Sequence, residues 1–341
     1  MAKVSFRNDY ATLMHPNVYR YLEDKLDVIN DAYGNDSYSQ SAKQRIIEKF
    51  GLPETTEVYF LAGGTQTNMV AISYILRDFE AVIAASSGHI NVHESGAVEA
   101  SGHKILTAPG KDGKLRGEDI DEVMRHVGDE HVVAPELIYI SNATETGTIY
   151  TKEELRSLHD AARRHGLLLF MDGARLGNAL MSDENDLAFE DIGHYCDAFY
   201  LGGTKNGLPL GEALVLINPV FHHRFANHIK ARGAMLAKGY FVGMLFDAIL
   251  QDDLYFSLAK HANDLSSKLQ EALKSHGLNP EPSPTNQVFV QVDDELGKAL
   301  IREFSCEIWE KNEKGYILRF VTSYRSKDSD IEALDLFLQA Q

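Results

Sequence analysis

The chain has little cysteine, less basic than acidic charge and no long apolar run. Cys196 and Cys306 are the only cysteines in 341 residues, which excludes a disulfide-rich scaffold or a cysteine-rich metal site and fits a reducing compartment. The 33 basic and 50 acidic residues give a net charge of −17, which argues against the clustered basic face of a nucleic-acid-binding protein. The first residues contain no apolar signal-peptide core, and no run of about 18 apolar residues could cross a membrane. These absences predict a cytoplasmic protein that binds neither nucleic acid nor a membrane.

Motifs for other chemistries are also missing. No Gly-x-Gly-x-x-Gly follows an apolar run and no Gly-x-x-x-x-Gly-Lys-Ser/Thr occurs, so nicotinamide and nucleoside-triphosphate binding lose their main support. His93-Glu94 matches the start of the zinc motif His-Glu-x-x-His, but Ala97 stands where the second histidine is needed. We therefore predict no metal ion and a structural role for His93.

Short apolar runs alternate with helical patterns from about residue 57 onward, which is typical of βαβ units around a mostly parallel sheet. Helices are expected over residues 17–32, 41–50, 221–231 and 239–274, from about Gly117, and from the capping box at Thr151 to Gly166. The seven candidate strands are residues 58–61, 81–85, 104–107, 137–141, 167–171, 198–201 and 213–217. The pattern predicts an α/β fold with a seven-stranded, mostly parallel sheet.

The C-terminal part reads as a separate unit. Residues 280–284 are a proline-rich breaker segment, and residues 288–292 and 316–321 alternate like strands around helices. A chain of this length can form one large domain and a smaller one. We predict an N-terminal arm and large domain over residues 1–239 and a small α+β domain over residues 240–341.

Two apolar runs of the large domain lead directly into reactive side chains. Residues 167–171 run into Asp172, and residues 197–201 run through Gly-Gly-Thr into Lys205. Taken singly, the Asp is equally explained as a helix cap and the Lys as a solvated loop residue. Together they match what a pyridoxal 5'-phosphate (PLP) enzyme needs: a lysine amine for a Schiff base with the cofactor aldehyde, and a carboxylate that keeps the pyridine nitrogen protonated.

A phosphate could be held near Gly63 and Gly64, which stand between a predicted strand and a predicted helix. Glycines allow close approach of the backbone, and the helix N-terminus supplies amide donors. Thr65 and Gln66 can add side-chain donors. The alternative is a plain strand-to-helix turn.

Three further side chains fit the same chemistry. His89 follows the strand at 81–85, and a loop beyond the carboxyl end of such a strand is where α/β sheets place ligands. It could lie on the cofactor ring and handle protons near neutral pH. Arg175 and Arg319 could each hold a substrate carboxylate in a bidentate contact; a structural ion pair is the alternative for Arg319.

These residues together resemble the L-threonine aldolase family, within the fold type I PLP-dependent transferase fold. The resemblance covers nearly the whole chain. Its matching segments are Phe6-Arg7-Asn8-Asp9, Tyr33-Gly34-Asn35-Asp36, Gly63-Gly64-Thr65-Gln66-Thr67-Asn68, His89, Met171-Asp172-Gly173-Ala174-Arg175, Thr204-Lys205 and Arg319-Phe320-Val321-Thr322.

The resemblance implies a role for each match. Lys205 is the expected Schiff-base residue, Asp172 lies against the pyridinium and His89 is stacked on the ring. The substrate-binding residues implied are Asn8, Tyr33, Arg175 and Arg319. The remaining cofactor contacts implied are Gly63, Gly64, Thr65, Arg175, Thr204 and Lys238. Family members are homotetramers with active sites shared across a dimer interface, so Tyr33 or Lys238 is expected to serve a neighbouring subunit.

The segment that contains Glu145 departs from the family pattern. Where many members carry a His in Glu-Asn-Thr-His, this chain has Asn-Ala-Thr-Glu145, which puts an acid where the substrate hydroxyl is expected. Asn8 also stands where a Ser is common. Similar Ala-Thr-Glu stretches resemble the phenylserine aldolase branch, which suggests a β-substituent larger than methyl.

The resemblance implies retro-aldol cleavage of an L-β-hydroxy-α-amino acid, such as L-threonine, L-allo-threonine or L-phenylserine, to glycine and an aldehyde. Lys205, His89, Asp172 and Glu145 are the expected catalytic residues. A β-eliminating lyase or an aminotransferase on the same fold is the nearest alternative. A PLP-binding protein without catalysis is the other.

Overall fold

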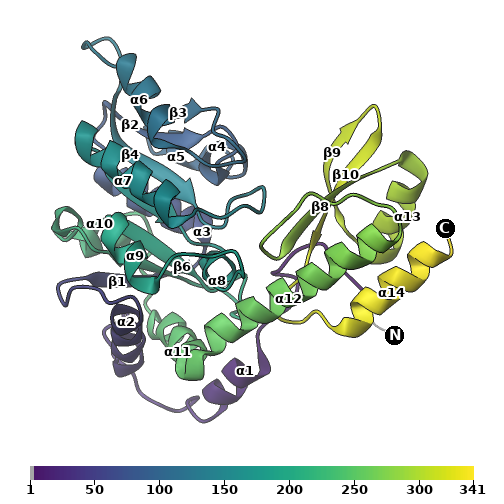
Figure 1. Cartoon of the computed structure of the whole chain (residues 1–341). Coiled ribbons are helices and arrows are strands. Elements are labelled where there is room, and N and C mark those ends of the chain that lie inside the picture. The colour runs from purple at the N-terminus through teal and green to yellow at the C-terminus, as the bar shows by residue number, and fades with distance from the viewer. Residues whose placement is uncertain (1–3) are drawn as a thin grey trace.

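The computed structural model describes residues 4–341, which form one large and one small β-sheet with helices packed around them (Figure 1). The strands of the large sheet are β1 (Glu57–Leu61), β2 (Glu80–Ala85), β3 (Lys104–Ala108), β4 (Ala134–Ser141), β5 (Leu168–Asp172), β6 (Ala198–Gly202) and β7 (Glu212–Leu216). Their order is β1-β7-β6-β5-β4-β2-β3, and β7 runs antiparallel to both of its neighbours. The other strand pairs are parallel. The predicted α/β fold with a seven-stranded, mostly parallel sheet is confirmed.

Helices cover both faces of this sheet and form most of the small unit. The α-helices are α1 (Pro16–Glu23), α2 (Ser37–Lys49), α3 (Gly64–Ile75), α4 (His89–Val92), α5 (Ala97–Ala100), α6 (Gly117–Arg125), α7 (Lys152–His165), α8 (Leu176–Leu180), α9 (Phe189–Tyr195), α10 (Phe225–Ala231), α11 (Tyr240–Ile249), α12 (Leu254–Ser275), α13 (Asp294–Phe304) and α14 (Asp328–Gln339). Two short 3-10 helices are η1 (Pro219–Phe221) and η2 (Gln251–Asp253). No helix within residues 4–341 is long and apolar enough to cross a membrane.

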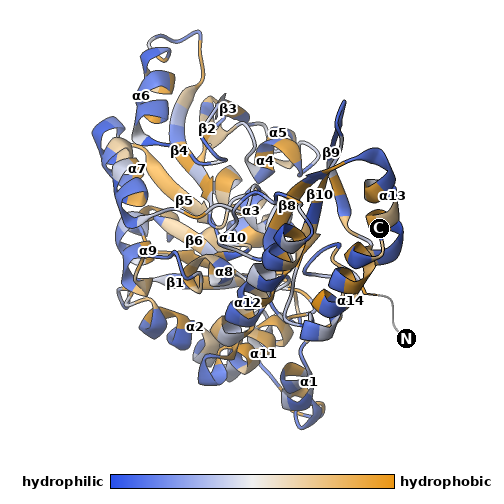
Figure 2. Cartoon of the chain, turned by 45° about the vertical axis from the view of Figure 1, so that its right-hand side comes forward, coloured by the Kyte–Doolittle hydropathy of each residue, from blue (hydrophilic) through white to orange (hydrophobic). Residues whose placement is uncertain are grey.

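The period-two alternation of the strands divides the core into two layers. In β4, Ile138 and Ile140 pack toward the layer that contains α2, α7 and α11. Leu137 and Tyr139 face the opposite layer, where α3, α5 and α10 lie. Figure 2 shows the hydrophobic central strands enclosed between helices with hydrophilic outer faces. Because Asp172 follows Phe170 by two residues, it is directed to the α3 side, the side that Tyr139 also faces.

The small sheet consists of β8 (Gln287–Val292), β9 (Glu307–Asn312) and β10 (Gly315–Val321), in the order β8-β10-β9 and antiparallel throughout. Its core contacts α12, α13 and α14. The N-terminal arm reaches the same core, since Phe6 is buried against Phe304 and Phe320. The smaller C-terminal α+β unit matches the sequence prediction, and its exact boundary at residues 239/240 stays a prediction.

The structure corrects several predicted elements. The helix predicted over residues 17–32 ends at Glu23, because the apolar residues that follow find no core: Leu26 is 83% and Ile29 98% exposed. The helix predicted over 239–274 is interrupted at Asp252 and Asp253, both in the left-handed region with φ of 50° and 55°. The first difference follows from the missing packing partner of Leu26 and Ile29, and the second from the backbone turn at the two aspartates.

Two further boundaries also differ from the sequence prediction. The helix predicted over residues 41–50 begins at Ser37, since the side chain of Asp36 caps it by accepting a hydrogen bond from the backbone N–H of Ser39 at 2.9 Å. Strand β9 was not predicted, because it is charged and partly exposed and carries a weak apolar pattern.

Candidate active site

The carboxyl ends of four strands bring together the predicted catalytic residues. His89 follows β2, Glu145 follows β4, Asp172 ends β5 and Lys205 follows β6. Because these strands are parallel, their carboxyl ends lie at one edge of the sheet, where open α/β sheets bind ligands. Residues that are up to 116 positions apart in the chain (89 to 205) therefore share one site.

Asp172 is a buried carboxylate held by three side-chain donors. Its Oδ2 accepts hydrogen bonds from Asn68 Nδ2 at 2.9 Å and Tyr139 OH at 2.6 Å, and its Oδ1 accepts one from Tyr200 OH at 2.5 Å. Burial alone would raise the pKa of Asp172, but the charge of His89 and these three donors hold the pKa below its ordinary value. Asp172 is therefore ionised at neutral pH.

A polar chain links Asp172 to His89. Asn68 Nδ2 also donates to Glu94 Oε1 at 2.7 Å, and the same oxygen contacts His89 Nδ1 at 2.8 Å. Burial would lower the pKa of His89, but the Glu94 hydrogen bond and the Asp172 charge raise it above its ordinary value. The ligand atoms of His89, Glu94 and Asp172 lie within 4.8 Å of one another. Hydrogen bonds engage His89 Nδ1, Glu94 Oε1 and both oxygens of Asp172, whereas Glu94 Oε2 has no partner among residues 4–341. The absence of a metal stays a prediction.

Lys205 stands in a loop shaped by a buried acid. Glu212 accepts hydrogen bonds from Thr204 Oγ1 at 2.7 Å and from the backbone N–H of Gly203 at 3.0 Å, and burial raises the pKa of Glu212 to about 8. Burial and the nearby Arg175 charge lower the pKa of the Lys205 amine. A lowered pKa increases the fraction of neutral amine, which is the nucleophilic form.

The start of α3 forms an open cradle beside Tyr200. Gly63 precedes the helix without a side-chain cap, and a Cβ placed on it would meet nothing within 4 Å. A Cβ on Gly64 would lie 3.1 Å from Tyr200 OH. The backbone N–H groups at this end of a 12-residue helix, with the exposed Thr65 side chain beside them, are suited to a phosphate.

A cavity of about 360 Å³ opens beside Lys205. It is lined by Tyr10, His89, His93, Glu145, Arg175, Lys205, Glu307, Ile308, Trp309 and Arg319. Glu145 Oε1 accepts hydrogen bonds from Ser141 Oγ at 2.7 Å and from the backbone N–H of His89 at 3.2 Å. Burial raises the pKa of Glu145, so this acid can exchange a proton closer to neutral pH than an exposed one.

The two candidate carboxylate-binding arginines differ in how they are held. Arg175 makes a bidentate, buried ion pair with Asp9, from Nε at 2.7 Å and Nη2 at 3.0 Å. Asp9 also accepts a hydrogen bond from Asn286 Nδ2 at 3.0 Å. Arg319 contacts the partly exposed Glu307 through Nη2. Both guanidinium groups line the cavity, and both have a protein carboxylate as partner.

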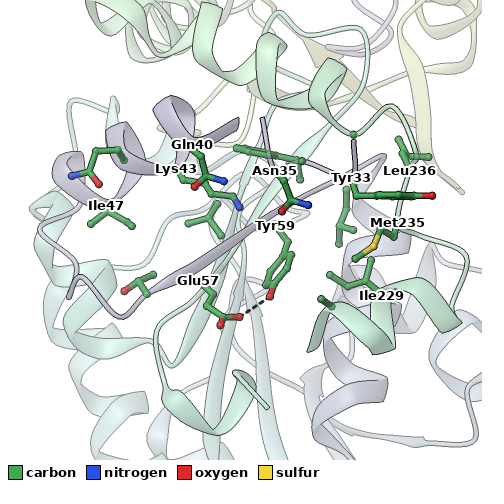
Figure 3. A pocket seen from close by; sticks show the side chains of 18 of the residues that line it. Tyr33, Asn35, Gln40, Lys43, Ile47, Glu57, Tyr59, Ile229, Met235 and Leu236 are labelled. Atoms are coloured by element: carbon green, nitrogen blue, oxygen red, sulfur yellow. Dashed lines mark hydrogen bonds between the residues drawn. The ribbon is translucent and has the colours of Figure 1, made fainter. Parts of the chain in front are cut away.

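Other predicted site residues lie elsewhere in this chain. Tyr33 lines a separate cavity of about 690 Å³ between α2, β1 and α10, together with Leu236 and Met235 (Figure 3). Lys238 is exposed two residues beyond Leu236. Asn8 is half-buried in the N-terminal arm, where its Oδ1 accepts a hydrogen bond from the backbone N–H of Tyr10 at 3.2 Å. None of these three is among the residues that line the cavity at Lys205.

Sequence reasoning assigned no role to five residues that hold the site together: Asp9, Asn68, Glu94, Tyr139 and Tyr200. Asn68 could have been found, since it lies about one helical turn after Gly64 on the same helix. Tyr139 and Tyr200 are polar-tipped residues in mostly apolar strands, which is a weaker signal. The pairing of Asp9 with Arg175 spans 166 residues and had no local signal.

Comparisons with known proteins identify the family. A model of the family described as beta-eliminating lyase matches residues 6–295. The low specificity L-threonine aldolase of Pseudomonas aeruginosa is 31% identical over 277 residues, which cover 79% of this chain and 78% of that protein. The low specificity L-threonine aldolase of Escherichia coli (strain K12) is 27% identical over 283 residues, 80% of this chain and 79% of that protein.

Solved structures agree with these sequence matches. The threonine aldolase of Leishmania major is 40% identical, covers 99% of both chains and superposes with a TM-score of 0.96. A serine palmitoyltransferase of Sphingomonas wittichii, 14% identical, covers 99% of this chain and 86% of that one with a TM-score of 0.71, and so shares the fold alone. The predicted family is confirmed. The chain therefore belongs to the beta-eliminating lyase family and, within it, to the L-threonine aldolases with the type I fold of PLP-dependent enzymes.

Proposed function

We propose that this protein is a PLP-dependent lyase that cleaves L-threonine, L-allo-threonine or a related L-β-hydroxy-α-amino acid, such as L-phenylserine, to glycine and an aldehyde. One observation carries the proposal. An ionised, buried Asp172 and a Lys205 amine of lowered pKa stand at neighbouring strand ends beside a cavity lined by cationic side chains. That arrangement can hold both ends of one cofactor and an anionic substrate.

The residues present fit PLP. The cradle at Gly63, Gly64 and Thr65 suits its phosphate, the ionised Asp172 suits a protonated pyridine nitrogen, and the Lys205 amine suits covalent attachment. Asn68 Oδ1 and Glu94 Oε2 are buried without a hydrogen-bond partner among residues 4–341, so the site retains polar capacity. When bound, PLP supplies an electron sink for the carbanion that is left when the Cα–Cβ bond breaks.

The side chains of this protein position the substrate and move its protons. Arg319 would receive the substrate carboxylate, as its guanidinium lines the cavity. Glu145, with a raised pKa, or His89 would take the proton of the β-hydroxyl group, as both line the same cavity. Asp172 stays charged and would therefore favour a protonated pyridine nitrogen in a bound cofactor.

The proposal is tested by incubating the PLP-loaded protein with L-threonine, L-allo-threonine and L-phenylserine and measuring aldehyde and glycine together. Equal amounts of the two products are expected, and their rates rank the substrates. A Lys205→Ala variant should lose at least about a thousandfold in kcat and the cofactor absorption band of the parent. Ammonia with a keto acid would instead indicate β-elimination, and a keto acid with an aminated cofactor would indicate transamination.

We further propose a homotetramer in which Tyr33 or Lys238 completes the site of a neighbouring subunit. The support is their place away from Lys205, on a surface that exposes Tyr33 and Leu236. Light scattering tests the assembly. Mixing Lys205→Ala and Tyr33→Ala subunits should restore activity if sites are shared, because some mixed sites carry both native residues; no restoration would contradict a shared site.

We also propose a cytoplasmic location. Cys196 and Cys306 are both free and buried, which suits a reducing compartment. Cell fractionation with an antibody tests it, and recovery in a membrane or secreted fraction would contradict it.

A further inference from the structure

Arg319 lines the cavity at Lys205, and its carboxylate partner, Glu307, can be displaced from it. Arg319 lies on β10 directly opposite Glu307 of β9, and its Nη2 donates to Glu307 Oε2. The Arg319 side chain is 12% exposed, whereas that of Glu307 is 44% exposed. Since the Glu307 side chain is already partly exposed to solvent, it can rotate away into water at little cost.

The pair at Arg175 shows the contrast. Asp9 is 1% exposed, engages both Nε and Nη2 of Arg175 and is held further by Asn286. Displacing Asp9 would leave a buried charge without a partner, which is costly. A carboxylate that enters the cavity can therefore displace the partner of Arg319 but not the partner of Arg175.

Arg319 would stay in place without Glu307. Its Nη1 donates to Oε1 of the buried Gln287 at 3.3 Å, and its guanidinium carbon lies 5.3 Å from the centroid of the Trp309 ring. Its Nε is buried without a hydrogen-bond partner among residues 4–341. The guanidinium thus keeps its orientation and has unmet donor capacity, as a carboxylate receptor requires.

We propose that Glu307 is a displaceable stand-in for the substrate carboxylate, which competes with it for Arg319 and thereby sets the affinity for amino-acid substrates. This inference rests on the proposed function, in which Arg319 receives the substrate carboxylate. While Glu307 neutralises the charge of Arg319, the empty cavity binds other anions more weakly. The substrate carboxylate takes the place of Glu307, and the displaced side chain moves into solvent.

The test uses acetate, a carboxylate without an amino group that could react with the cofactor. Trp309 is the only tryptophan of the chain, so acetate binding to the holoenzyme can be followed by tryptophan fluorescence at constant ionic strength. In Glu307→Gln the dissociation constant for acetate should fall about fivefold, the range of an exposed ion pair. The KM for L-threonine should fall by the same factor with kcat unchanged, because the change affects ground state and transition state equally.

Glu310→Gln is the matched control. It removes the same charge from an exposed position of β9 and should change neither the dissociation constant for acetate nor the KM for L-threonine. An unchanged control shows that Glu307 acts by competing for Arg319 and not through the overall charge of the strand. Arg319→Gln should abolish the acetate response. The inference is overturned if Glu307→Gln leaves acetate binding unchanged or weaker, if Glu310→Gln has the same effect, or if the response survives in Arg319→Gln. Failure to release aldehyde from any β-hydroxy amino acid would overturn the proposed function instead, because the acetate titration needs no turnover.

Discussion

At the scale of single residues, the site depends on donors that surround one carboxylate. Asp172 is buried, and burial favours the protonated form of a carboxyl group. The charge of His89 and the hydrogen bonds from Tyr139, Tyr200 and Asn68 reverse that preference and lower the pKa of Asp172. All three donors therefore help to keep Asp172 charged, although none of them lines the cavity at Lys205.

A Tyr200→Phe variant tests this dependence. Removing one of the three side-chain donors should raise the pKa of Asp172, and the acid limb of the pH–activity profile should move to higher pH by about one unit, the size of one such bond. The pH dependence of kcat measures it. Tyr255→Phe is the control, since Tyr255 is equally buried but donates to the carbonyl of Gly202; a similar shift there would refute the assignment.

At the scale of secondary structure elements, close packing of α2 and α11 holds the N-terminal segment against the large sheet. Gly243 of α11 permits the contact, because a Cβ there would lie 2.0 Å from Ser39 Oγ and 2.8 Å from Ser39 Cα. Ser39 in turn donates to Asp36 Oδ2 at 2.7 Å at the start of α2. Ser39 therefore takes part both in the start of α2 and in the contact between α2 and α11.

Gly243→Ala should lower the free energy of unfolding by about 1–3 kcal/mol, because the new methyl group forces the two helices apart. Alanine's better helix propensity offsets only about 1 kcal/mol of strain. Urea unfolding followed by circular dichroism measures the change. Gly128→Ala, where a Cβ meets nothing within 4 Å, should stay within about 0.5 kcal/mol of the parent; equal effects would contradict the packing argument.

At the scale of the whole molecule, Asp9 connects three parts of the chain. It belongs to the N-terminal arm, pairs with Arg175 of the large sheet region and accepts a hydrogen bond from Asn286, next to β8 of the small sheet. Burial would raise the pKa of Asp9, but the charges of Arg175 and Lys205 lower it below its ordinary value. The contact therefore contributes stability while Asp9 is ionised.

Asp9→Ala should lower the free energy of unfolding by about 3–5 kcal/mol at neutral pH, because Arg175 is left buried and unpaired. The pKa of Asp9 is lower in the folded state, so its contribution is present above the unfolded pKa of about 3.9 and is lost as pH falls through the folded value. The difference between parent and variant should narrow in acid, as measured by urea unfolding at several pH values. Asp160→Ala breaks an exposed pair with Arg156 and should cost under about 1 kcal/mol; an equal loss in the two variants would contradict the argument.

The elements best predicted from the sequence are those that depend on local pattern. All seven strands of the large sheet follow from apolar runs of fitting length, and the capping box at Thr151 with Gly166 at the other end bounds α7 correctly. The elements that differ from the sequence prediction are those whose length or presence depends on tertiary contacts. Leu26 and Ile29 continue an apolar pattern yet end in solvent, and β9 pairs with β10 despite its exposed, charged face.

The same division holds for the site. Residue chemistry and position at strand ends were enough to select Asp172, Lys205 and His89, because a strand end is a local feature and its neighbours in a parallel sheet follow from topology. Two of the carboxylate partners could not be selected, because Asp9 reaches Arg175 across 166 residues and Glu307 reaches Arg319 from a separate strand. Glu94, only five residues after His89, lies in the same segment as its partner. The sequence by itself determined the fold and the family, and it selected candidate reacting groups at the strand ends. Only the tertiary structure decided which carboxylates are paired, because an ion pair depends on distances and burial that exist only once distant segments have packed together.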